Sequence, residues 1–527
     1  MDIFLPNHLS GAWQPAGEPV NVLSDPVTGA ALAACGGPAA GLDEGFAFAR
    51  ATGRAGLQAL TYGQRAAMLA ETLKVLQANR EAYYEISLAN SGTTRNDSAV
   101  DIEGACFTLG YYAKLGAALG DTRTLLDGAP ASLAKDNAFC AQHILAPVRG
   151  LALFINAFNF PAWGLWEKAA PALLSGVPVV IKPATATAWL THRMVADVLA
   201  AKVLPEGALS IVCGGSAGLL DALQPFDVLS FTGSADTAAQ LRAHPAIARN
   251  SVRANIEADS LNAFILGPDG APGSAVFDNY VADLARELTI KSGQRCTAPR
   301  RALVPAEHFD AVAEALGARL SKVVTGNPRN ESVRMGALVS RAQWIGVHDG
   351  IADLVGEVEV LVDGRRAPLV DADADVAACI APTVLGVRDG AAARRVHDHE
   401  IFGPVTTLIG YRADGTGDAN ANAFALAHRG LGSLVASAYS ADTAWLARAG
   451  AELAGSHGRV HLVNPDVAKV HSGHGNVMPA AVHGGPGRAG GGEELGGWRA
   501  LGFYHRRSAL QAAPAVLAAL DHAAPLP

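Results

Sequence analysis

The sequence is poor in cysteine, in aromatic residues and in charge. Of its 527 residues, six are cysteines, 6% are aromatic and 17% are charged. The cysteines stand singly, without a CxxC pair or a histidine-rich ligand spacing. This excludes a small disulfide-stapled scaffold and indicates a reducing compartment and no zinc or other metal site. They are Cys35, Cys106, Cys140, Cys213, Cys296 and Cys379.

Positive charge and long apolar runs are also lacking. The formal net charge of -8 and the pI near 6.1 exclude a broad nucleic-acid-binding surface and fit a small, anionic ligand better. The most apolar stretch, 151–190, is interrupted by Asn, Pro, Glu and Lys residues that a membrane span does not tolerate together. Residues 1–13 carry an acid at Asp2 and no basic or long apolar segment, so we expect no secretory signal and a cytoplasmic protein.

A chain of this length is expected to form two or three packed domains. Helical spacing of apolar residues over about 43–119 predicts a mostly helical N-terminal layer. The next region alternates short β-rich runs with longer amphipathic ones, which predicts an α/β fold with a doubly wound parallel sheet. Its expected strands are 151–156, 177–182, 209–213, 228–231 and 252–257, and its expected helices are 163–174, 186–202, 217–223 and 235–243. A second α/β region is expected over 258–464, with helices at 276–290 and 309–320.

Polar residues and glycines follow the predicted strands where they end. They are Asn159, Lys182, Gly214, Gly233 and Glu257. Ligands of doubly wound sheets bind at the carboxyl ends of the strands, so this edge is the predicted binding site. Backbone N–H groups of Gly233 and Ser234, at the start of a helix, are suited to hold a phosphate, although Ser234 acting only as a helix cap explains the same pattern. The role of Lys182 also has two interpretations, because a lysine at the end of a strand is often merely solvated.

The match to GxGxxG at Gly485, Gly487 and Gly490 is not interpreted as a dinucleotide fingerprint. That motif requires a strand that turns into a helix, whereas here a glycine-dense loop containing Pro486 surrounds it. We expect this loop to pack against another chain or to line a pocket.

Cys296 is the candidate nucleophile. It lies in a polar loop, Ser292–Thr297, beside Arg295, a setting that favours the thiolate, whereas a single cysteine is otherwise a buried hydrophobe. Glu257 is the candidate base, because a carboxylate near a thioester can deprotonate water. The alternative is that its side chain serves only as a cap or in an ion pair.

Over nearly its whole length the chain resembles the aldehyde dehydrogenases. The motifs, in the order seen in that family, are Asn159-Phe-Pro, Lys182-Pro-Ala-Thr, Phe231-Thr-Gly-Ser, Glu257, Gly293-Gln-Arg-Cys and Glu400-Ile-Phe-Gly-Pro. Signatures that begin at Ile155, Glu257 and His483 are most similar to the semialdehyde dehydrogenases of aerobic benzoate degradation through benzoyl-CoA epoxidation, and to the dehydrogenase part of the bifunctional phenylacetate ring-opening protein. The chain departs from the general family at 258–261, where the usual Leu-Gly-Gly-Lys is replaced. No hydratase domain follows, so we expect the stand-alone enzyme.

The resemblance implies three structural parts. They are a Rossmann-like cofactor domain over 1–130 and 149–257, a catalytic domain over 258–464, and a small β oligomerisation arm over 131–148 and 498–515. Two strand pieces within 137–148 are expected to pair with a C-terminal piece near 500–508. Since an extended arm cannot bury its apolar face alone, we expect a homodimer or a dimer-based assembly.

The resemblance also implies the roles of the site residues. Cys296 attacks the aldehyde, the Asn159 amide and the Cys296 N–H hold the oxyanion, and Glu257 activates the water that hydrolyses the thioester. The implied cofactor-binding residues are Phe158, Lys182, Ala184, Thr185, Gly215, Gly218, Phe231, Thr232, Gly233, Ser234, Glu400 and Phe402. No metal is needed, because the dinucleotide carries the hydride chemistry.

Thr185 favours NADP over NAD, with NAD still possible. Related enzymes that prefer NAD commonly carry an acid at this position, whereas a neutral hydroxyl leaves room for the 2′-phosphate near Lys182. The alternative is that Thr185 only caps the helix that is expected to begin near Ala186.

The implied substrate is an aldehyde linked to CoA, 3,4-didehydroadipyl-CoA semialdehyde, which is oxidised to the acid in aromatic degradation. Two alternatives stay open. In a CoA-acylating dehydrogenase free CoA attacks the thioester, and Glu257 counts against it because water activation is then unwanted. A non-catalytic structural or binding relative is disfavoured by the presence of Cys296, Asn159 and Glu257.

Overall fold

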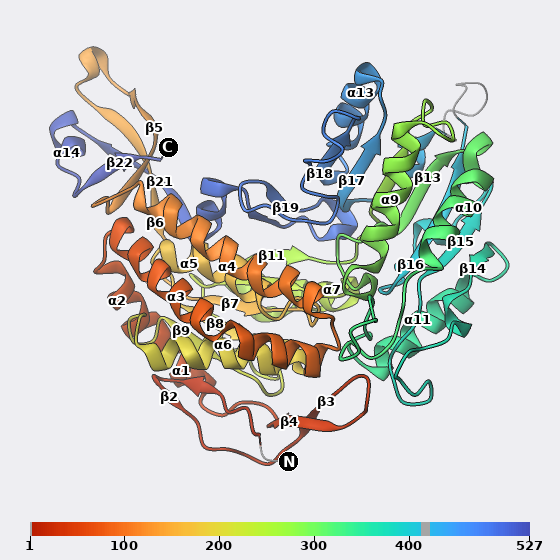
Figure 1. Ribbon diagram of the computed structural model, residues 1–527. Coiled ribbons are helices and arrows are strands. Elements are labelled where there is room, and N and C mark those ends of the chain that lie inside the picture. The colour runs from red at the N-terminus through yellow and green to blue at the C-terminus, as the bar shows by residue number, and fades with distance from the viewer. Residues whose placement is uncertain (1–2, 413–421, 527) are drawn as a thin grey trace.

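The computed structural model describes residues 3–412 and 422–526. Two seven-stranded sheets, each with helices packed against it, form the body of this part of the chain, and a four-stranded sheet stands out from it (Figure 1). No helix of the described residues is both long enough and apolar enough to cross a bilayer.

The first sheet contains the five predicted parallel strands, with two short antiparallel strands at one edge. Its order is β11-β10-β7-β8-β9-β1-β2. The bounds are β1 His8–Leu9, β2 Ala12–Trp13, β7 Ala152–Ile155, β8 Val179–Lys182, β9 Leu209–Ile211, β10 Val228–Thr232 and β11 Arg253–Glu257. The inner strands are buried on both faces, which explains their continuous apolar sequence. The prediction of a doubly wound parallel sheet is confirmed.

Long helices cover this sheet, as the N-terminal pattern predicts. They include α3 Tyr62–Ile86, α4 Arg95–Ala117, α5 Trp163–Leu174, α6 Ala188–Ala201 and α7 Ala235–Ala243, and the shorter helices are α1 Leu42–Phe48, α2 Arg54–Gln58 and α8 Pro245–Asn250. Thr61 begins α3 through a capping box with Gln64. The predicted helix at 217–223 is wrong, because these residues form turns around Gly218, whose φ is +82°, a conformation that no helix contains.

The second sheet is parallel except for the edge strand β14, and its order is β14-β15-β16-β13-β12-β17-β18. The strands are β12 Ala263–Leu266, β13 Arg301–Pro305, β14 Glu359–Val362, β15 Thr383–Val387, β16 Val405–Tyr411, β17 Ser433–Tyr439 and β18 His457–Val463. The helices are α9 Ala275–Thr289, α10 Phe309–Leu320, α11 Arg341–Leu354, α12 Ala423–His428 and α13 Thr443–Leu453. Both helices expected in this region are confirmed as α9 and α10.

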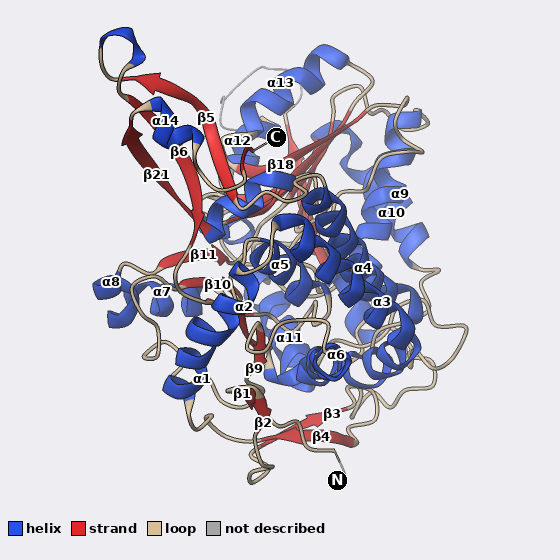
Figure 2. Cartoon of the chain, turned by 90° about the vertical axis from the view of Figure 1, so that its left-hand side faces the viewer, coloured by secondary structure: helices blue, strands red, loops and turns tan. Residues whose placement is uncertain are grey.

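The protruding sheet has the order β21-β6-β5-β22. Figure 2 shows β21, β6 and β5 of this sheet standing out from the body. Its strands are β5 Thr124–Ser132, β6 Cys140–Pro147, β21 His505–Ala512 and β22 Ala523–Pro525, and α14 Pro514–Ala518 follows β21. β21 pairs antiparallel with β6 over eight residues, which confirms the expected pairing for the part 505–508 of the C-terminal piece. The expectation of two strand pieces within 137–148 is wrong, because these residues contain one strand, β6. Residues 497–504 are a 3-10 helix rather than a strand. A further small pair, β3 Asn21–Ser24 and β4 Ala31–Cys35, lies near the N-terminus.

The glycine-rich loop joins the two halves of the body. It lies between β19 Val482–Gly484 and β20 Glu493–Leu495 and contains only a three-residue 3-10 helix, so it lacks the strand-to-helix turn of a dinucleotide fingerprint. The Ala258 N–H donates to Ala489 O at 3.0 Å, and the Arg488 N–H donates to Leu431 O at 2.9 Å. The loop thus packs within its own chain, between β11 and β17.

Candidate active site

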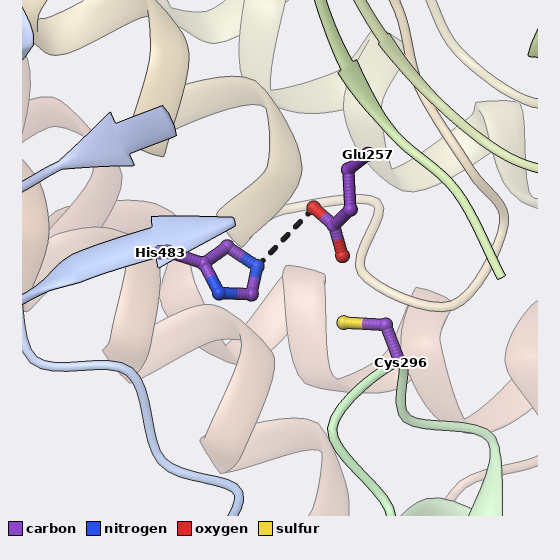
Figure 3. A group of neighbouring side chains, drawn as sticks. All are labelled: Glu257, Cys296 and His483. Atoms are coloured by element: carbon purple, nitrogen blue, oxygen red, sulfur yellow. Dashed lines mark ion pairs between the residues drawn. The ribbon is translucent and has the colours of Figure 1, made fainter. Parts of the chain in front are cut away.

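Three side chains from different parts of the fold meet where the first sheet faces the second. Glu257 ends β11, Cys296 lies in the loop after α9, and His483 lies on β19; Figure 3 shows them pointing toward one another. One ligand atom of each lies within 4.8 Å of the others, and His483 Nε2 is 3.2 Å from Glu257 Oε2. Glu257 and His483 are buried, whereas Cys296 is partly exposed. A partly exposed thiol beside a buried carboxylate can act as a nucleophile next to a base.

The loop that carries Cys296 has an unusual backbone. Lys291, Ser292 and Gly293 have φ values of +53°, +54° and +67° in sequence. At Gly293, a Cβ atom would lie 2.2 Å from Gly403 O, so this position requires glycine. Two of the predicted motifs, that of Cys296 and that of Glu400, therefore touch through their backbones at this point.

Asn262 fixes the same loop from the other side. Its Nδ2 donates to Cys296 O at 2.7 Å and to Ala298 O at 2.9 Å, and its Oδ1 accepts from Val435 N and Ser260 Oγ. All four hydrogen-bonding positions of this fully buried amide are used. Within the segment 258–261, where the chain departs from the general family, Ser260 joins this network, because its hydroxyl donates to Asn262 Oδ1 and accepts from Leu434 N on β17.

The prediction that its surroundings favour the thiolate of Cys296 is wrong. Burial raises the pKa of Cys296 well above its ordinary value, and the charge of Glu257 raises it further. Arg295 counteracts this only weakly, because its guanidinium is bound to Glu287 Oε2 at 2.8 Å and to Asn476 Oδ1 at 3.2 Å. Although Arg295 is next to Cys296 in the sequence, its guanidinium does not pair with the sulfur.

Glu257 belongs to a buried network of acids around one lysine. Burial raises its pKa, but the positive charges of His483 and Lys168 outweigh this and lower the pKa to about 2. Lys168 pairs with Glu167 and, at 3.2 Å, with Glu494 Oε2. Glu257 is therefore ionised at neutral pH, as a base that accepts a proton from water must be.

Asn159 lies close to this group. Its side chain lines the same cavity as Glu257 and Cys296, and its Nδ2 donates to Gln294 O at 3.1 Å. One N–H of the amide is thereby fixed, which leaves the other to a ligand. No hydrogen bond is found for the Cys296 N–H within residues 3–412 and 422–526.

A cavity of about 470 Å³ extends from Cys296 along the carboxyl edge of the first sheet. Most of the predicted cofactor residues line it. They are Phe158, Ala184, Phe231, Thr232, Gly233, Ser234, Glu400 and Phe402. Ser234 also accepts from the Thr237 N–H at 3.3 Å, so the cap interpretation and the cavity interpretation both hold for it.

Four predicted cofactor residues do not line this cavity. Lys182 is buried, and its Nζ donates to Pro183 O at 2.6 Å. Gly215 donates to Gly37 O at 2.9 Å, and Gly218 lies in the turns after β9. Thr185 opens a 3-10 turn, and α6 begins at Ala188 with no side-chain cap, so the alternative that Thr185 caps this helix is wrong.

Glu400 and Phe402 are held firmly at the far wall of the cavity. Glu400 accepts from Arg300 Nε at 3.2 Å and from Ser260 N at 3.1 Å, while burial raises its pKa to about 7. The ring of Phe402 stands edge-on to Phe158, with 5.7 Å between the ring centroids. The wall thus offers one carboxyl group and two aromatic rings to a ligand.

A second, mostly apolar cavity of about 350 Å³ also borders Cys296. Its lining includes Phe107, Phe160, Trp163, Val477 and Met478. The thiol therefore lies between a larger, more polar cavity and a smaller, apolar one.

Sequence reasoning missed His483, Asn262, Lys168 and Glu494. Each lies in a segment that had drawn notice: His483 and Glu494 flank the glycine-rich loop, Asn262 ends the signature that begins at Glu257, and Lys168 lies in the predicted helix 163–174. Charged residues inside an otherwise apolar helix were the available signal for Lys168.

Comparisons with known proteins find relatives over most of the chain. The model of the aldehyde dehydrogenase family matches residues 13–516. A 3,4-dehydroadipyl-CoA semialdehyde dehydrogenase from Aromatoleum evansii is 52% identical over 484 residues, covering 92% of this chain and 93% of its own.

Solved structures share the fold. A betaine aldehyde dehydrogenase from Staphylococcus aureus in complex with NAD+ superposes with a TM-score of 0.81 at 21% identity, covering 97% of each chain. An aldehyde dehydrogenase from Brucella melitensis biovar abortus 2308 gives the same TM-score, identity and coverage. Because the family model matches most of the chain and the relative from Aromatoleum evansii is 52% identical to it, the chain belongs to the aldehyde dehydrogenase family.

Proposed function

We propose that the protein oxidises a CoA-linked semialdehyde to the carboxylic acid, with NADP as the preferred cofactor. The observation that carries this proposal is that Cys296, Glu257 and Asn159 line one cavity, while Cys296 also lines a second, apolar one. The relative from Aromatoleum evansii, with its name, supports the substrate class. In this proposal the first sheet belongs to the cofactor domain, residues 1–130 and 149–257, and the second to the catalytic domain, residues 258–464.

The first step is the attack of the Cys296 sulfur on the aldehyde carbon, for which the thiol proton leaves to solvent through the cavity. A thiohemiacetal forms, and its oxyanion accepts hydrogen bonds from the Cys296 N–H and from the free N–H of Asn159, whose other N–H is held by Gln294 O. The hydrogen bonds of Asn262 keep the sulfur at the mouth of both cavities.

The cavity of about 470 Å³ fits a nicotinamide dinucleotide, because it pairs aromatic walls with backbone N–H groups at the start of α7. When bound, the cofactor supplies the hydride acceptor. The roles proposed for this chain are that Glu400 and Phe402 hold a ribose and that Gly233 and Ser234 face a phosphate. Lys182, the last residue of β8, and Thr185, in the segment that follows, lie outside the cavity lining, where they would face the adenosine end, with Gly215 and Gly218 on the next loop.

Glu257 then hydrolyses the thioester. Its carboxylate takes a proton from a water molecule, the hydroxide attacks the thioester carbon, and the thiolate of Cys296 leaves. A low pKa of Glu257 keeps it ionised for this step. Since a CoA-acylating enzyme has no use for such a base, Glu257 also argues against that alternative.

The apolar cavity suits the carbon chain of the aldehyde. A volume of about 350 Å³ is at the lower end for drug-sized ligands, so the acyl chain would enter while the CoA nucleotide stays outside. The lack of an acidic side chain at Thr185 supports NADP, because a carboxylate would repel the 2′-phosphate.

The test measures reduced nicotinamide by absorbance with matched aldehydes that carry or lack CoA. We expect the highest kcat/KM for the CoA-linked semialdehyde with NADP, and a free acid as product. Cys296→Ala should abolish turnover while leaving cofactor binding intact. Turnover by Cys296→Ala would overturn the mechanism, and an acyl-CoA product formed only with free CoA would favour the acylating alternative.

We also propose a dimer built through the protruding sheet, with residues 131–148 and 498–515 as its arm. Arg506 and Arg507 on β21 and Phe139 and Leu133 near the tip are exposed in the single chain. Light scattering on the wild type and on a chain lacking 133–139 should show loss of the dimer in the latter; a monomeric wild type would contradict the proposal.

A further inference from the structure

The group of Cys296, Glu257 and His483 offers three different ligand types to one point. A thiol, a carboxylate and an imidazole are the side chains that bind zinc in proteins. Their ligand atoms lie within 4.8 Å of one another, and each comes from a separate element of the fold (Figure 3). A tetrahedral ion with three protein ligands and one open position requires such a set.

The Nδ1 atom of His483 has no hydrogen-bond partner among the described residues, although the side chain is fully buried. Its Nε2 faces only the Glu257 carboxylate, 3.2 Å from Oε2, and Glu257 Oε1 has no hydrogen-bond partner either. Buried polar groups are nearly always paired, so a buried imidazole aimed at a thiol and a carboxylate calls for a ligand. The edge of the Trp163 ring system, at 5.6 Å between centroids, holds the imidazole in place.

The charge around the group favours a cation. Glu167, Glu257 and Glu494 place carboxylate oxygens within 4.8 Å of one another, and Lys168 is the ammonium that pairs with two of them. Arg295 is neutralised by Glu287 at 2.8 Å. Three carboxyl groups around one ammonium leave a surplus of acidic ligands on the side of Cys296.

We propose that Cys296, Glu257 and His483 bind one Zn²⁺ ion, which inhibits the enzyme by occupying its nucleophile. On binding, the thiol proton and the proton on His483 Nε2 leave to solvent, bonds form from the metal to Cys296 Sγ, a Glu257 carboxylate oxygen and His483 Nε2, and a water takes the fourth position toward the cavity. No oxidation state changes. The site does not depend on which aldehyde the enzyme oxidises.

The test titrates the full-length, metal-free protein with Co²⁺ in the absence of substrate and cofactor. We expect one equivalent to bind, with a thiolate-to-cobalt absorption band and the visible bands of tetrahedral cobalt, and Zn²⁺ to displace it. His483→Asn should weaken cobalt binding by roughly 100-fold or more. The loss of a residue that is hydrogen-bonded to a metal ligand already weakens binding by about 10- to 100-fold, and the loss of the ligand itself should have a larger effect. Cys296→Ser should remove the thiolate band.

His348→Asn is the matched control, since His348 is a partly buried histidine stacked on Trp344, and it should bind cobalt as the wild type does. Thermal unfolding of each variant verifies its fold. Unweakened binding to His483→Asn, or no tetrahedral cobalt in an active wild-type enzyme, would overturn the site. Because binding is measured without turnover, this result is independent of the proposed reaction.

Discussion

Replacing Asn262 by Asp tests whether this residue positions the nucleophile. The change keeps the shape of the side chain but turns the two donors to Cys296 O and Ala298 O, at 2.7 and 2.9 Å, into a carboxylate oxygen that can only accept. Each buried carbonyl that loses its donor costs about 1–3 kcal/mol, so the free energy of unfolding should fall by about 2–6 kcal/mol at pH 8.

The loss should depend on pH. A buried carboxyl group that faces carbonyl oxygens has a folded-state pKa raised above the value of about 3.9 in the unfolded chain. The protonated form can donate one hydrogen bond, so the deficit is smallest below pH 4 and grows as the pH rises through the folded-state pKa. Chemical denaturation followed by tryptophan fluorescence at pH 5 and pH 8 measures this.

The same variant should carry out the first chemical step more slowly. A displacement of the Cys296 loop by a fraction of an ångström to 1 Å lowers the rate of the pre-steady-state burst by roughly 10- to 100-fold, with cofactor affinity little changed. Asn422→Asp is the control, because Asn422 is an exposed helix cap that aspartate replaces equally well. A deficit of less than 1 kcal/mol at pH 8 together with an unchanged burst would refute the role assigned to Asn262.

Four further predictions concern the site. Glu257→Gln should give a burst of one reduced cofactor per site and then a steady state slower by roughly 10²–10⁴-fold, measured by stopped-flow absorbance; an equal loss in both phases would indicate an earlier role. The same variant should lower the pKa of Cys296, because the charge of Glu257 raises it, and iodoacetamide should alkylate the thiol faster at pH 7. Thr185→Glu should shift the ratio of kcat/KM values toward NAD by a factor of ten or more, about 1.4 kcal/mol for each tenfold, and an unchanged ratio would place selectivity elsewhere. Gly293→Ala should cost about 1–3 kcal/mol through overlap with a neighbouring carbonyl oxygen, visible in the melting temperature, whereas Gly502→Ala, with open space around it, should not.

The parts of the fold that rest on periodicity were predictable. The five parallel strands and the helix at 163–174 follow from apolar patterning, and the carboxyl-edge rule placed Asn159 and Glu257 at one site. The helix expected at 217–223 failed because a seven-residue pattern cannot show that Gly218 adopts a left-handed conformation.

The electrostatics of the site were not predictable from neighbours in the sequence. Arg295 adjoins Cys296 in the chain, yet its charge is taken by Glu287. His483, which contacts Glu257, is separated from it by the whole second sheet. Long-range packing therefore decided which charges reach the sulfur, and a single sequence carries no signal for that.

The protruding sheet can be completed only late in the synthesis of the chain. β5 and β6 emerge early, but the partner of β6 is β21, which comes near the C-terminus. At 5–20 residues per second, the interval between them is on the order of tens of seconds. During that time β6 presents an unpaired edge, the feature by which strands associate wrongly with other chains. A newborn chain is thus open to aggregation at this edge, and a chaperone that shields it until β21 arrives would raise the yield of folded protein.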